Sequence, residues 1–283
     1  MTIELRPARA EDAAELGRIC YEAFKDISDR HGFPTDFISA EFAQRVIAGQ
    51  VQDEQVYGVA AFEDGAPKGS NFVNLRSDVA GIGPVSVDLS SQGQGIGRKL
   101  MEDAIAHARA QGYEMIRLCQ DSFNMQSLAL YASLGFDTKE PIALLELASD
   151  LPVDPAIRPA TSDDFEAMDE LCRSIYRVSR MGGTVGLIEH GFPAFVLDRG
   201  HVAGYLVGTL AGHGVAESDD DMLALLAGLG ARAPEAQAFV AIRHGELYRR
   251  ALAAGHRNRK LMNLMALGPY EEPRGTYCPS VIF

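Results

Sequence analysis

The sequence predicts an α/β fold of two related modules, each a mixed, twisted sheet flanked by helices. Its 283 residues suit about two domains of roughly 150 residues each. An apolar share of 47% and a charged share of 23% are typical of a globular chain. The opening of the chain also recurs 152 positions later: Leu5-Arg6-Pro7-Ala8, Asp12 and Cys20 return as Ile157-Arg158-Pro159-Ala160, Asp164 and Cys172.

A strand closed by proline and followed by a helix explains both copies of this opening. Proline cannot donate to a strand ladder, and acidic residues favour the first turn of a helix. Thr161 or Ser162 is expected to cap the second of these helices. We place the boundary in the proline-containing loop 149–155, which gives modules of residues 1–150 and 151–283.

Hydrophobic periodicity and turn residues set the order of elements in the first module. Helices are expected near 11–29 and 36–48, followed by strands near 56–63, 69–75 and 83–87, a helix at 95–111, a strand at 115–119, a helix at 125–134 and a strand at 142–147. The helix at 95–111 carries its apolar residues on one side, and Gly112 is expected to end it.

The stretch from Val85 to Leu100 passes from a strand through several glycines into a helix. Glycines let backbone amides approach an anion, and the unsatisfied amides of a helix start favour negative charge. This glycine turn, residues 92–98, therefore predicts an anion site suited to a diphosphate. A dinucleotide motif that starts at Gly93 would need glycine at position 98, where Arg98 stands, and a P-loop would need Ser or Thr after Gly-Lys.

Two motifs point to a family. Gln92, Gly95 and Gly97 form Gln-x-x-Gly-x-Gly, which resembles the acetyl-CoA signature of the GCN5-related N-acetyltransferase (GNAT) superfamily. Residues 124–136, Asn-Met-Gln-Ser-Leu-Ala-Leu-Tyr-Ala-Ser-Leu-Gly-Phe, look like the Asn-x-x-Ala-x-x-Leu-Tyr-x-x-x-Gly-Phe element of that family, with Ser127 at the small position. The order and spacing of both motifs agree, and the repeated opening makes the whole chain resemble tandem GNAT members.

The resemblance implies a role for each matching residue. The pyrophosphate of coenzyme A would lie on the backbone amides of the glycine turn, and Arg98 and Lys99 would add charge. The residues of the turn that would contribute are Gln92, Gly93, Gln94, Gly95, Ile96, Gly97 and Arg98. The arm of the cofactor would pair with the backbone at Val85 and Val87, and Asn124 would hold it. A backbone amide near Val87 would polarise the thioester carbonyl. Tyr131 would protonate the departing thiolate after direct attack by an amine, although a core tyrosine is the alternative.

The general base cannot be assigned from the sequence. Asp78, Asp88 and Asp121 are candidates, but acids near strand ends are usually solvated caps, and family members often use a water relay. Cys119 ends a strand nearby and is interpreted as a buried small hydrophobe, because no histidine lies beside it in the sequence to make it a nucleophile.

The second module is expected to be a degenerate copy, with a hairpin at 194–198 and 202–208 and a helix at 221–231. A shift of 123 places Gln92, Gly95 and Gly97 opposite Val215, Ser218 and Asp220. The carboxylates of 219–221 would repel a pyrophosphate. The second module also repeats the later motif, since Leu247-Tyr248 before Gly255-His256 resembles Leu130-Tyr131 before Gly135-Phe136. Tyr248 is interpreted as a core residue. The basic residues that follow are interpreted as cations on a solvated helix face: Arg249, Arg250, Arg257, Arg259 and Lys260.

Composition excludes several classes of function. A formal charge of -13 makes nucleic acid and anionic membrane poor partners. No apolar run approaches the roughly 18 residues of a membrane span, and the start lacks a signal-peptide core, so we expect a cytoplasmic protein. The four cysteines and seven histidines show no metal-ligand spacing, so no metal is expected.

The leading hypothesis is an N-acetyltransferase that moves an acetyl group from acetyl-CoA to a primary amine of a small molecule or peptide. The first module would be catalytic, and the second would shape the acceptor pocket. The alternative is a catalytically silent GNAT-fold module that binds coenzyme A or another protein. The acceptor and the oligomeric state stay open.

Overall fold

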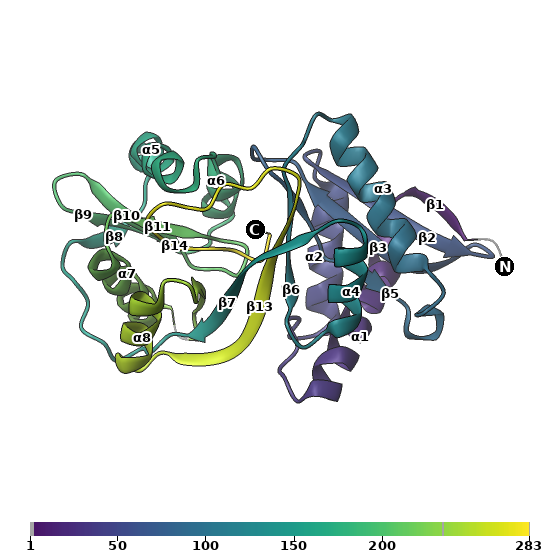
Figure 1. Cartoon of the computed structure of the whole chain (residues 1–283), viewed down its shortest axis with the longest axis horizontal. Coiled ribbons are helices and arrows are strands. Elements are labelled where there is room, and N and C mark those ends of the chain that lie inside the picture. Colours follow the sequence, from purple (N-terminus) through teal and green to yellow (C-terminus); the bar gives the residue numbers. More distant parts are fainter. Residues whose placement is uncertain (1–2, 234, 283) are drawn as a thin grey trace. The chain divides into compact units, whose positions relative to one another are not determined.

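The computed structural model describes residues 3–233 and 235–282, so Met1, Thr2, Pro234 and Phe283 of the two expected modules lie outside it. It confirms the α/β class, and one series of elements occurs twice along the chain (Figure 1). The first series is β1 (Glu4–Pro7), α1 (Ala13–His31), α2 (Ala40–Gln52), β2 (Val56–Glu63), β3 (Ala66–Asn74), β4 (Ala80–Ile82), β5 (Ser86–Val87), α3 (Ile96–Ala110), β6 (Ile116–Asp121), α4 (Met125–Ser133) and β7 (Asp137–Glu146).

The second series follows the same order, with one strand in place of β4 and β5. It comprises β8 (Ile157–Pro159), α5 (Phe165–Tyr176), α6 (Met181–Glu189), β9 (Ala194–Asp198), β10 (Val202–Val207), β11 (Gly214–Ala216), α7 (Asp219–Arg232), β12 (Gln237–Ala241), α8 (Gly245–Ala253) and β13 (Arg257–Leu267), and β14 (Thr276–Cys278) comes after it. None of the helices in the described part of the chain combines the length and hydropathy that crossing a bilayer requires.

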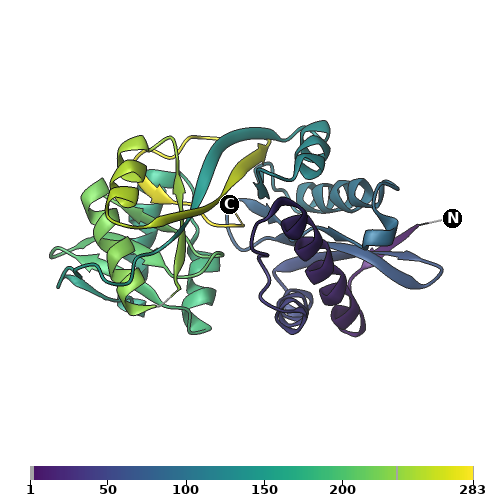
Figure 2. The same ribbon diagram turned by 90° about the horizontal axis from the view of Figure 1, so that it is seen from below.

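The chain packs as two compact units, of which the first holds the residues up to Leu118 together with 124–136. Its strands are ordered β1-β2-β3-β4-β6, and β5 pairs with β3. Alternating residues of β2 face opposite layers: Ala60 and Phe62 pack with α1 and α2, whereas Val59 and Ala61 pack with α3. Helices α1 and α2 therefore cover one face of this sheet and α3 the other (Figure 2).

The prediction of a single strand at 83–87 is wrong. The structure has two short strands, β4 before and β5 after a cis Gly83-Pro84 bond. Strand β4 pairs with β3 and runs parallel to β6, whereas β5 pairs with β3 further along. Proline has no N–H to donate, so a continuous ladder cannot pass through Pro84. Val85 consequently lies between the two strands rather than inside one.

The second unit holds 119–123 and the chain from Asp137 onward. One of its sheets has the order β14-β11-β10-β9-β8. Helices α5 and α6 pack on one face of it and α7 on the other (Figure 1). In the other group of strands, β13 lies between the end of β6 and β7, and β12 pairs with the far side of β7. Because β7 pairs with these later strands, packing divides the chain before Asp137, whereas the boundary near 150 marks where the repeated sequence begins.

Three of the cations placed on a helix face, Arg257, Arg259 and Lys260, lie instead in strand β13. The side chain of Lys260 is 2% exposed, and its ammonium lies 2.6 Å from the carboxylate of Asp121. That interpretation is therefore wrong for these residues. A half-buried run of mixed polar and apolar residues forms a strand here because β7 offers it a partner for nine residue pairs.

The repeated opening of the sequence builds the same local structure twice. The guanidinium of Arg6 donates two hydrogen bonds to Asp12, at 2.7 and 2.8 Å, and that of Arg158 donates two to Asp164, at 2.8 and 2.7 Å. Both carboxylates are buried, and these bonds hold the pKa of Asp12 below its usual value and lower that of Asp164 to about 2. Thr161 is the N-cap of the short 3₁₀ turn Ser162–Asp164, whereas Asp164 is the N-cap of α5, so the expected helix cap lies at Asp164 rather than at Thr161 or Ser162.

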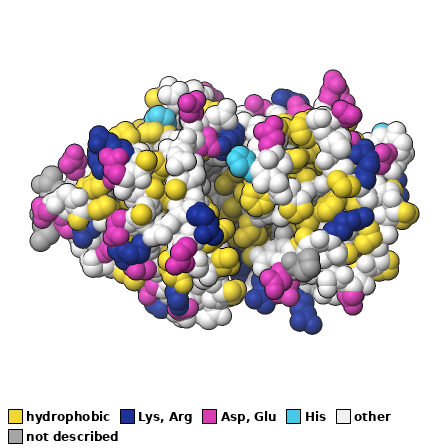
Figure 3. All heavy atoms as spheres, turned by 180° about the vertical axis from the view of Figure 1, so that it is seen from behind, with side chains coloured by type: hydrophobic (Ala, Val, Ile, Leu, Met, Phe, Trp, Pro, Cys, Tyr) yellow, Lys and Arg dark blue, Asp and Glu magenta, His cyan; other side chains and the backbone are white. Residues whose placement is uncertain are grey.

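Charged side chains are interspersed over the surface that Figure 3 shows. Acidic and basic residues alternate across this face, so the basic residues in view do not form a continuous stripe.

Candidate active site

The glycine turn forms an exposed backbone cradle at the start of α3. Gly93 and Gly95 have positive φ angles of 77° and 81°, and a Cβ atom on either would meet no other atom within 4 Å. Gly95 is the N-cap of α3. The N–H groups of the first helical turn have no carbonyl partner within the helix, so they are available to an anion. The space beside the glycines is open to receive one.

Strand β5 directs the backbone of Val87 away from β3. The N–H of Asp88 donates to Lys68 C=O at 2.9 Å, and Ser86 pairs with Ser70 across the same ladder. In an antiparallel pair, alternate residues bond the partner strand, so the N–H and C=O of the intervening Val87 point to the opposite side. The resemblance implied this arrangement for a strand that pairs with the cofactor arm.

The side chain of Gln92 reaches back from the glycine turn to this strand. Its Nε2 donates to the carbonyl of Val87 at 3.2 Å. The sequence motif predicted a contribution from Gln92 through its backbone, and did not predict this bond. Gln94 makes a weaker local contact, from Nε2 to Ser90 C=O at 3.4 Å.

Helix α4 packs beside the start of α3. A Cβ atom on Gly97 would lie 3.5 Å from Leu130 Cδ2 and 3.8 Å from Val87 Cγ2, which are ordinary contact distances and show that three segments meet at this point. Arg98 Nη2 donates to Ser133 Oγ at 2.6 Å. The structure therefore brings together β5, the glycine turn and the helix that carries Tyr131. Ser133 was missed because no charge or motif distinguishes it in the sequence.

Tyr131 is buried within this assembly, with 9% of its surface exposed. Its ring packs against that of Phe136 with the centroids 6.2 Å apart. Asn124 is the N-cap of α4, and its Oδ1 accepts a hydrogen bond from the N–H of Ser127 at 3.1 Å. That oxygen is engaged in holding the helix start, and a part for Asn124 in holding the cofactor arm stays a prediction.

Two of the candidate bases already have partners. Asp88 accepts hydrogen bonds from the hydroxyl and the N–H of Ser90, and these bonds lower its pKa. Asp121 lies against the ammonium of Lys260. Asp78 lies in the bend before β4. A carboxylate whose charged form is stabilised in this way is a weak proton acceptor, so neither Asp88 nor Asp121 is well suited to act as the base.

Cys119 has the environment of an inert thiol. Its Sγ donates to the carbonyl of Ser280 at 3.1 Å. Loss of solvent raises the pKa of the thiol to about 12, so it is protonated at neutral pH. The interpretation of Cys119 as a structural residue agrees with these features.

The second series lacks the glycine turn altogether. The helices α3 and α7 have Gly95 and Ser218 as their N-caps, which confirms the shift of 123 for the helix starts. Eight positions separate Val87, the end of β5, from the first of these caps, whereas two positions separate Ala216, the end of β11, from the second. Val215, which the shift places opposite Gln92, lies inside β11, so that part of the alignment is wrong: the loop has been shortened.

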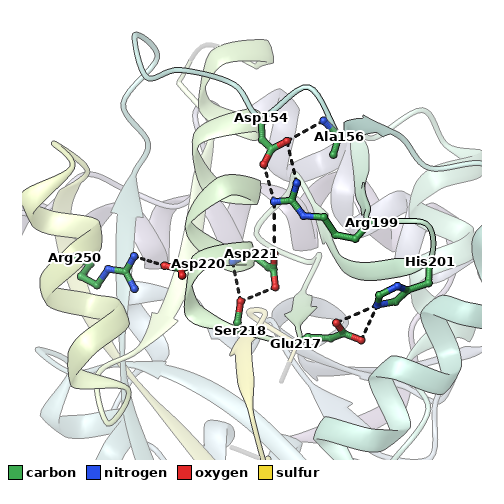
Figure 4. A network of polar contacts seen from close by, with 9 residues as sticks. All are labelled: Asp154, Ala156, Arg199, His201, Glu217, Ser218, Asp220, Asp221 and Arg250. Carbon is green, nitrogen blue, oxygen red and sulfur yellow. Dashed lines mark hydrogen bonds and ion pairs between the residues drawn. The ribbon is translucent and has the colours of Figure 1, made fainter.

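The carboxylates at the start of α7 are bonded to groups of the protein itself, and Figure 4 shows the contacts of Asp220 and Asp221. Ser218 Oγ accepts from the N–H of Asp221 at 3.2 Å, which caps the helix. The three carboxylates have the following partners: Asp219 accepts from Thr276 Oγ1, Asp220 from Arg250, and Asp221 from Ser218 Oγ. Side chains of the same unit therefore occupy the position that would receive an anion.

The helix α8 also lacks a counterpart of Tyr131. The N-caps of α4 and α8 are Asn124 and His244, 120 positions apart. After each helix, an N–H bonds back to a carbonyl in the last turn, from Phe136 to Tyr131 in the first series and from His256 to Ala251 in the second. Ala251 thus stands where Tyr131 stands in the first series. Tyr248, which the sequence suggested as the echo of Tyr131, corresponds to position 128 and packs against the core, as expected for its side chain.

Among residues 3–233 and 235–282, no three His, Cys, Asp or Glu side chains gather closely enough to hold a metal ion.

Residues 16–136 match the model of the acetyltransferase (GNAT) family. Over 77 residues the chain is 38% identical to a mycothiol acetyltransferase from Thermomonospora curvata, a match that covers 27% of this chain and 26% of that relative. The match therefore spans about a quarter of the curated relative.

Solved structures share the fold over nearly the whole chain. A putative acetyltransferase from Pyrococcus horikoshii superposes with a TM-score of 0.80 at 16% identity, covering 97% of this chain and 92% of that one. A GCN5-related N-acetyltransferase from Sphaerobacter thermophilus gives a TM-score of 0.62 at 18% identity, covering 97% and 98%. The segment that matches the acetyltransferase (GNAT) family model, residues 16–136, holds the glycine turn and the helix with Tyr131.

Proposed function

We propose that the chain is an acetyl-CoA-dependent N-acetyltransferase that acts on a primary amine of a small molecule or peptide. The observation that carries the proposal is the open glycine turn at the start of α3, with Val87 of β5 and the helix of Tyr131 packed against it. A diphosphate fits this turn because the exposed amides and the helix dipole both favour negative charge. Acetyl-CoA supplies the activated acetyl group.

In this proposal the residues of the first series bind and orient the donor. The amides of residues 92–98 and the guanidinium of Arg98 hold the pyrophosphate. The carbonyl of Val87, which uses one lone pair for Gln92, accepts from an amide of the arm with the other. The Val87 N–H polarises the thioester carbonyl. The amine nitrogen then attacks the carbonyl carbon, a C–N bond forms as the C–S bond breaks, and Tyr131 gives its proton to the thiolate. The proton that the amine loses passes to solvent, and solvent returns a proton to the phenolate of Tyr131.

The second series is proposed to be a duplicated module that binds no coenzyme A. Three features support this: the glycine turn is shortened, carboxylates stand at the helix start, and Ala251 replaces the proposed acid. Its repeated arginine–aspartate opening supports a common origin with the first series. A module of this kind can contribute packing surface and acceptor-binding loops without catalysis.

The test is turnover of acetyl-CoA with a panel of primary amines, measured as free thiol released and as acetylated product by mass. The Gly95→Glu variant is expected to abolish turnover and donor binding, because its carboxylate enters the glycine turn. Gly65→Glu is the matched control, since Gly65 has a φ of 78° and equally open space in a distant hairpin. Equal activity of the wild type and the Gly95→Glu variant would refute the assignment of the glycine turn.

A further inference from the structure

Ser133 is bonded in a way that fixes its hydroxyl as an acceptor. Its Oγ donates to the carbonyl of Leu130 at 2.7 Å, which uses the only proton that the hydroxyl has. The Oγ lone pairs then face Arg98, whose Nη2 donates at 2.6 Å. The direction of both bonds is therefore consistent, and the serine holds one end of the guanidinium.

This bond restrains a side chain that would otherwise be mobile. Arg98 is 45% exposed at the first turn of α3, and an exposed arginine loses considerable rotamer entropy when it is held in one position. A carboxylate also lies near the guanidinium, because Glu102, one turn further along α3, is 3.7 Å from Nη1. The shorter contact, the hydrogen bond to Ser133, attaches Arg98 to α4.

We propose that Ser133 is a positioning residue that holds Arg98 for the pyrophosphate, and so makes the site selective for thioesters that carry a diphosphate. The inference rests on the proposed function. It also links the helix that carries Tyr131 to the helix that carries the glycine turn, because one bond joins α4 and α3. Holding the arginine in advance lowers the entropy that donor binding would otherwise cost.

The second series supplies an internal comparison. By the shifts that match the helix caps, Asp221 stands at the position of Arg98 and Ala253 at that of Ser133. The two helices are joined there by a different pair, Asp220 and Arg250. The arginine and its serine partner are thus both absent where the glycine turn is absent, as expected if they serve the same ligand.

The test compares two donors, acetyl-CoA and S-acetylpantetheine, which lacks the pyrophosphate. For Ser133→Ala we expect the KM and Kd of acetyl-CoA to rise about three- to tenfold, as for loss of one charge-assisted hydrogen bond, with kcat unchanged. The KM of S-acetylpantetheine should stay within twofold of the wild-type value. Ser133→Thr keeps a hydroxyl and should restore most of the affinity for acetyl-CoA.

Ser174→Ala is the matched control. Ser174 lies exposed near the end of α5, and its hydroxyl donates to the carbonyl of Leu171, three residues earlier, at 2.7 Å. Removing it deletes the same local bond without touching Arg98, and both KM values should be unchanged. A Ser133→Ala variant that weakens both donors equally, or neither, overturns the positioning role. If the wild type binds acetyl-CoA no better than S-acetylpantetheine, the proposed function itself fails at the glycine turn.

Discussion

Replacing Tyr131 by phenylalanine removes one hydroxyl and leaves the rest of the side chain in place. The ring is buried and packs on Phe136, and phenylalanine fills the same volume, so we expect the free energy of unfolding to fall by only about 1 kcal/mol. Truncation to alanine would instead cost roughly 3–5 kcal/mol through the cavity it leaves. A positioned general acid contributes about 10²- to 10⁴-fold to the rate, so kcat of Tyr131→Phe should fall at least about a hundredfold.

The assay separates chemistry from binding. Single-turnover release of thiol gives the chemical rate, and calorimetric titration gives the Kd of acetyl-CoA. This Kd should stay within twofold, because the proposal places the pyrophosphate on the amides of residues 92–98 and not on Tyr131. Tyr113→Phe is the control: its hydroxyl donates to the carbonyl of Leu75, beyond the opposite end of α3, and its loss should leave kcat unchanged. An unchanged rate in Tyr131→Phe, or equal losses of rate and affinity, would refute the role of Tyr131 as the acid.

Three further predictions concern stability and the site. The buried imidazoles of His213 and His256 have pKa values lowered by burial, so the unfolded chain binds protons that the folded chain does not, and the free energy of unfolding should fall as pH drops below about 6.5 in denaturant titrations. Asp164→Ala should cost about 1–2 kcal/mol at pH 7; because the carboxylate has its pKa lowered to about 2, the difference from wild type should shrink as pH falls from about 4 toward 2. Gly69→Ala should raise the KM for acetyl-CoA, because the new Cβ would lie 2.4 Å from Ser86 C=O and push β5 away; an unchanged KM would argue against pairing of the cofactor arm with this strand.

The parts of the fold that depend on local sequence were predictable. The helix expected at 95–111 is α3, Ile96–Ala110, because one apolar face and a terminal glycine specify it. The strand expected at 56–63 coincides with β2. The repeated opening was visible because Arg158 and Asp164 keep the same spacing as Arg6 and Asp12, and a bidentate pair needs both members.

The parts that depend on distant partners were not predictable. Lys260 was assigned to a solvated helix face because nothing near it in sequence shows that β13 lies beside β7 and that Asp121 neutralises its charge. Strand pairing over more than a hundred residues leaves only a weak alternation of burial in either sequence. Likewise, the cis Gly83-Pro84 bond that separates β4 from β5 has no signal beyond the proline itself.

The residues of the candidate site also fall into these two groups, those predictable from local sequence and those that depend on distant partners. Residues held by their own turn or helix, such as Gly95 and Tyr131, could be identified because their motifs extend along one segment. Ser133 and the bond from Gln92 to Val87 were missed, since each joins two segments and involves a residue type common on any surface. The second series shows the converse error: an alignment without gaps placed Val215 opposite Gln92, although the loop between strand and helix had been shortened.

The central claim is that one glycine turn per chain binds the donor. Calorimetric titration of the full chain with acetyl-CoA, which reads stoichiometry together with affinity, tests it most directly. We expect one site per chain in the wild type and none in Gly95→Glu, with the Gly65→Glu control binding normally. Two sites per chain would contradict the loss of the second site, and no detectable binding would contradict the acetyltransferase proposal as a whole.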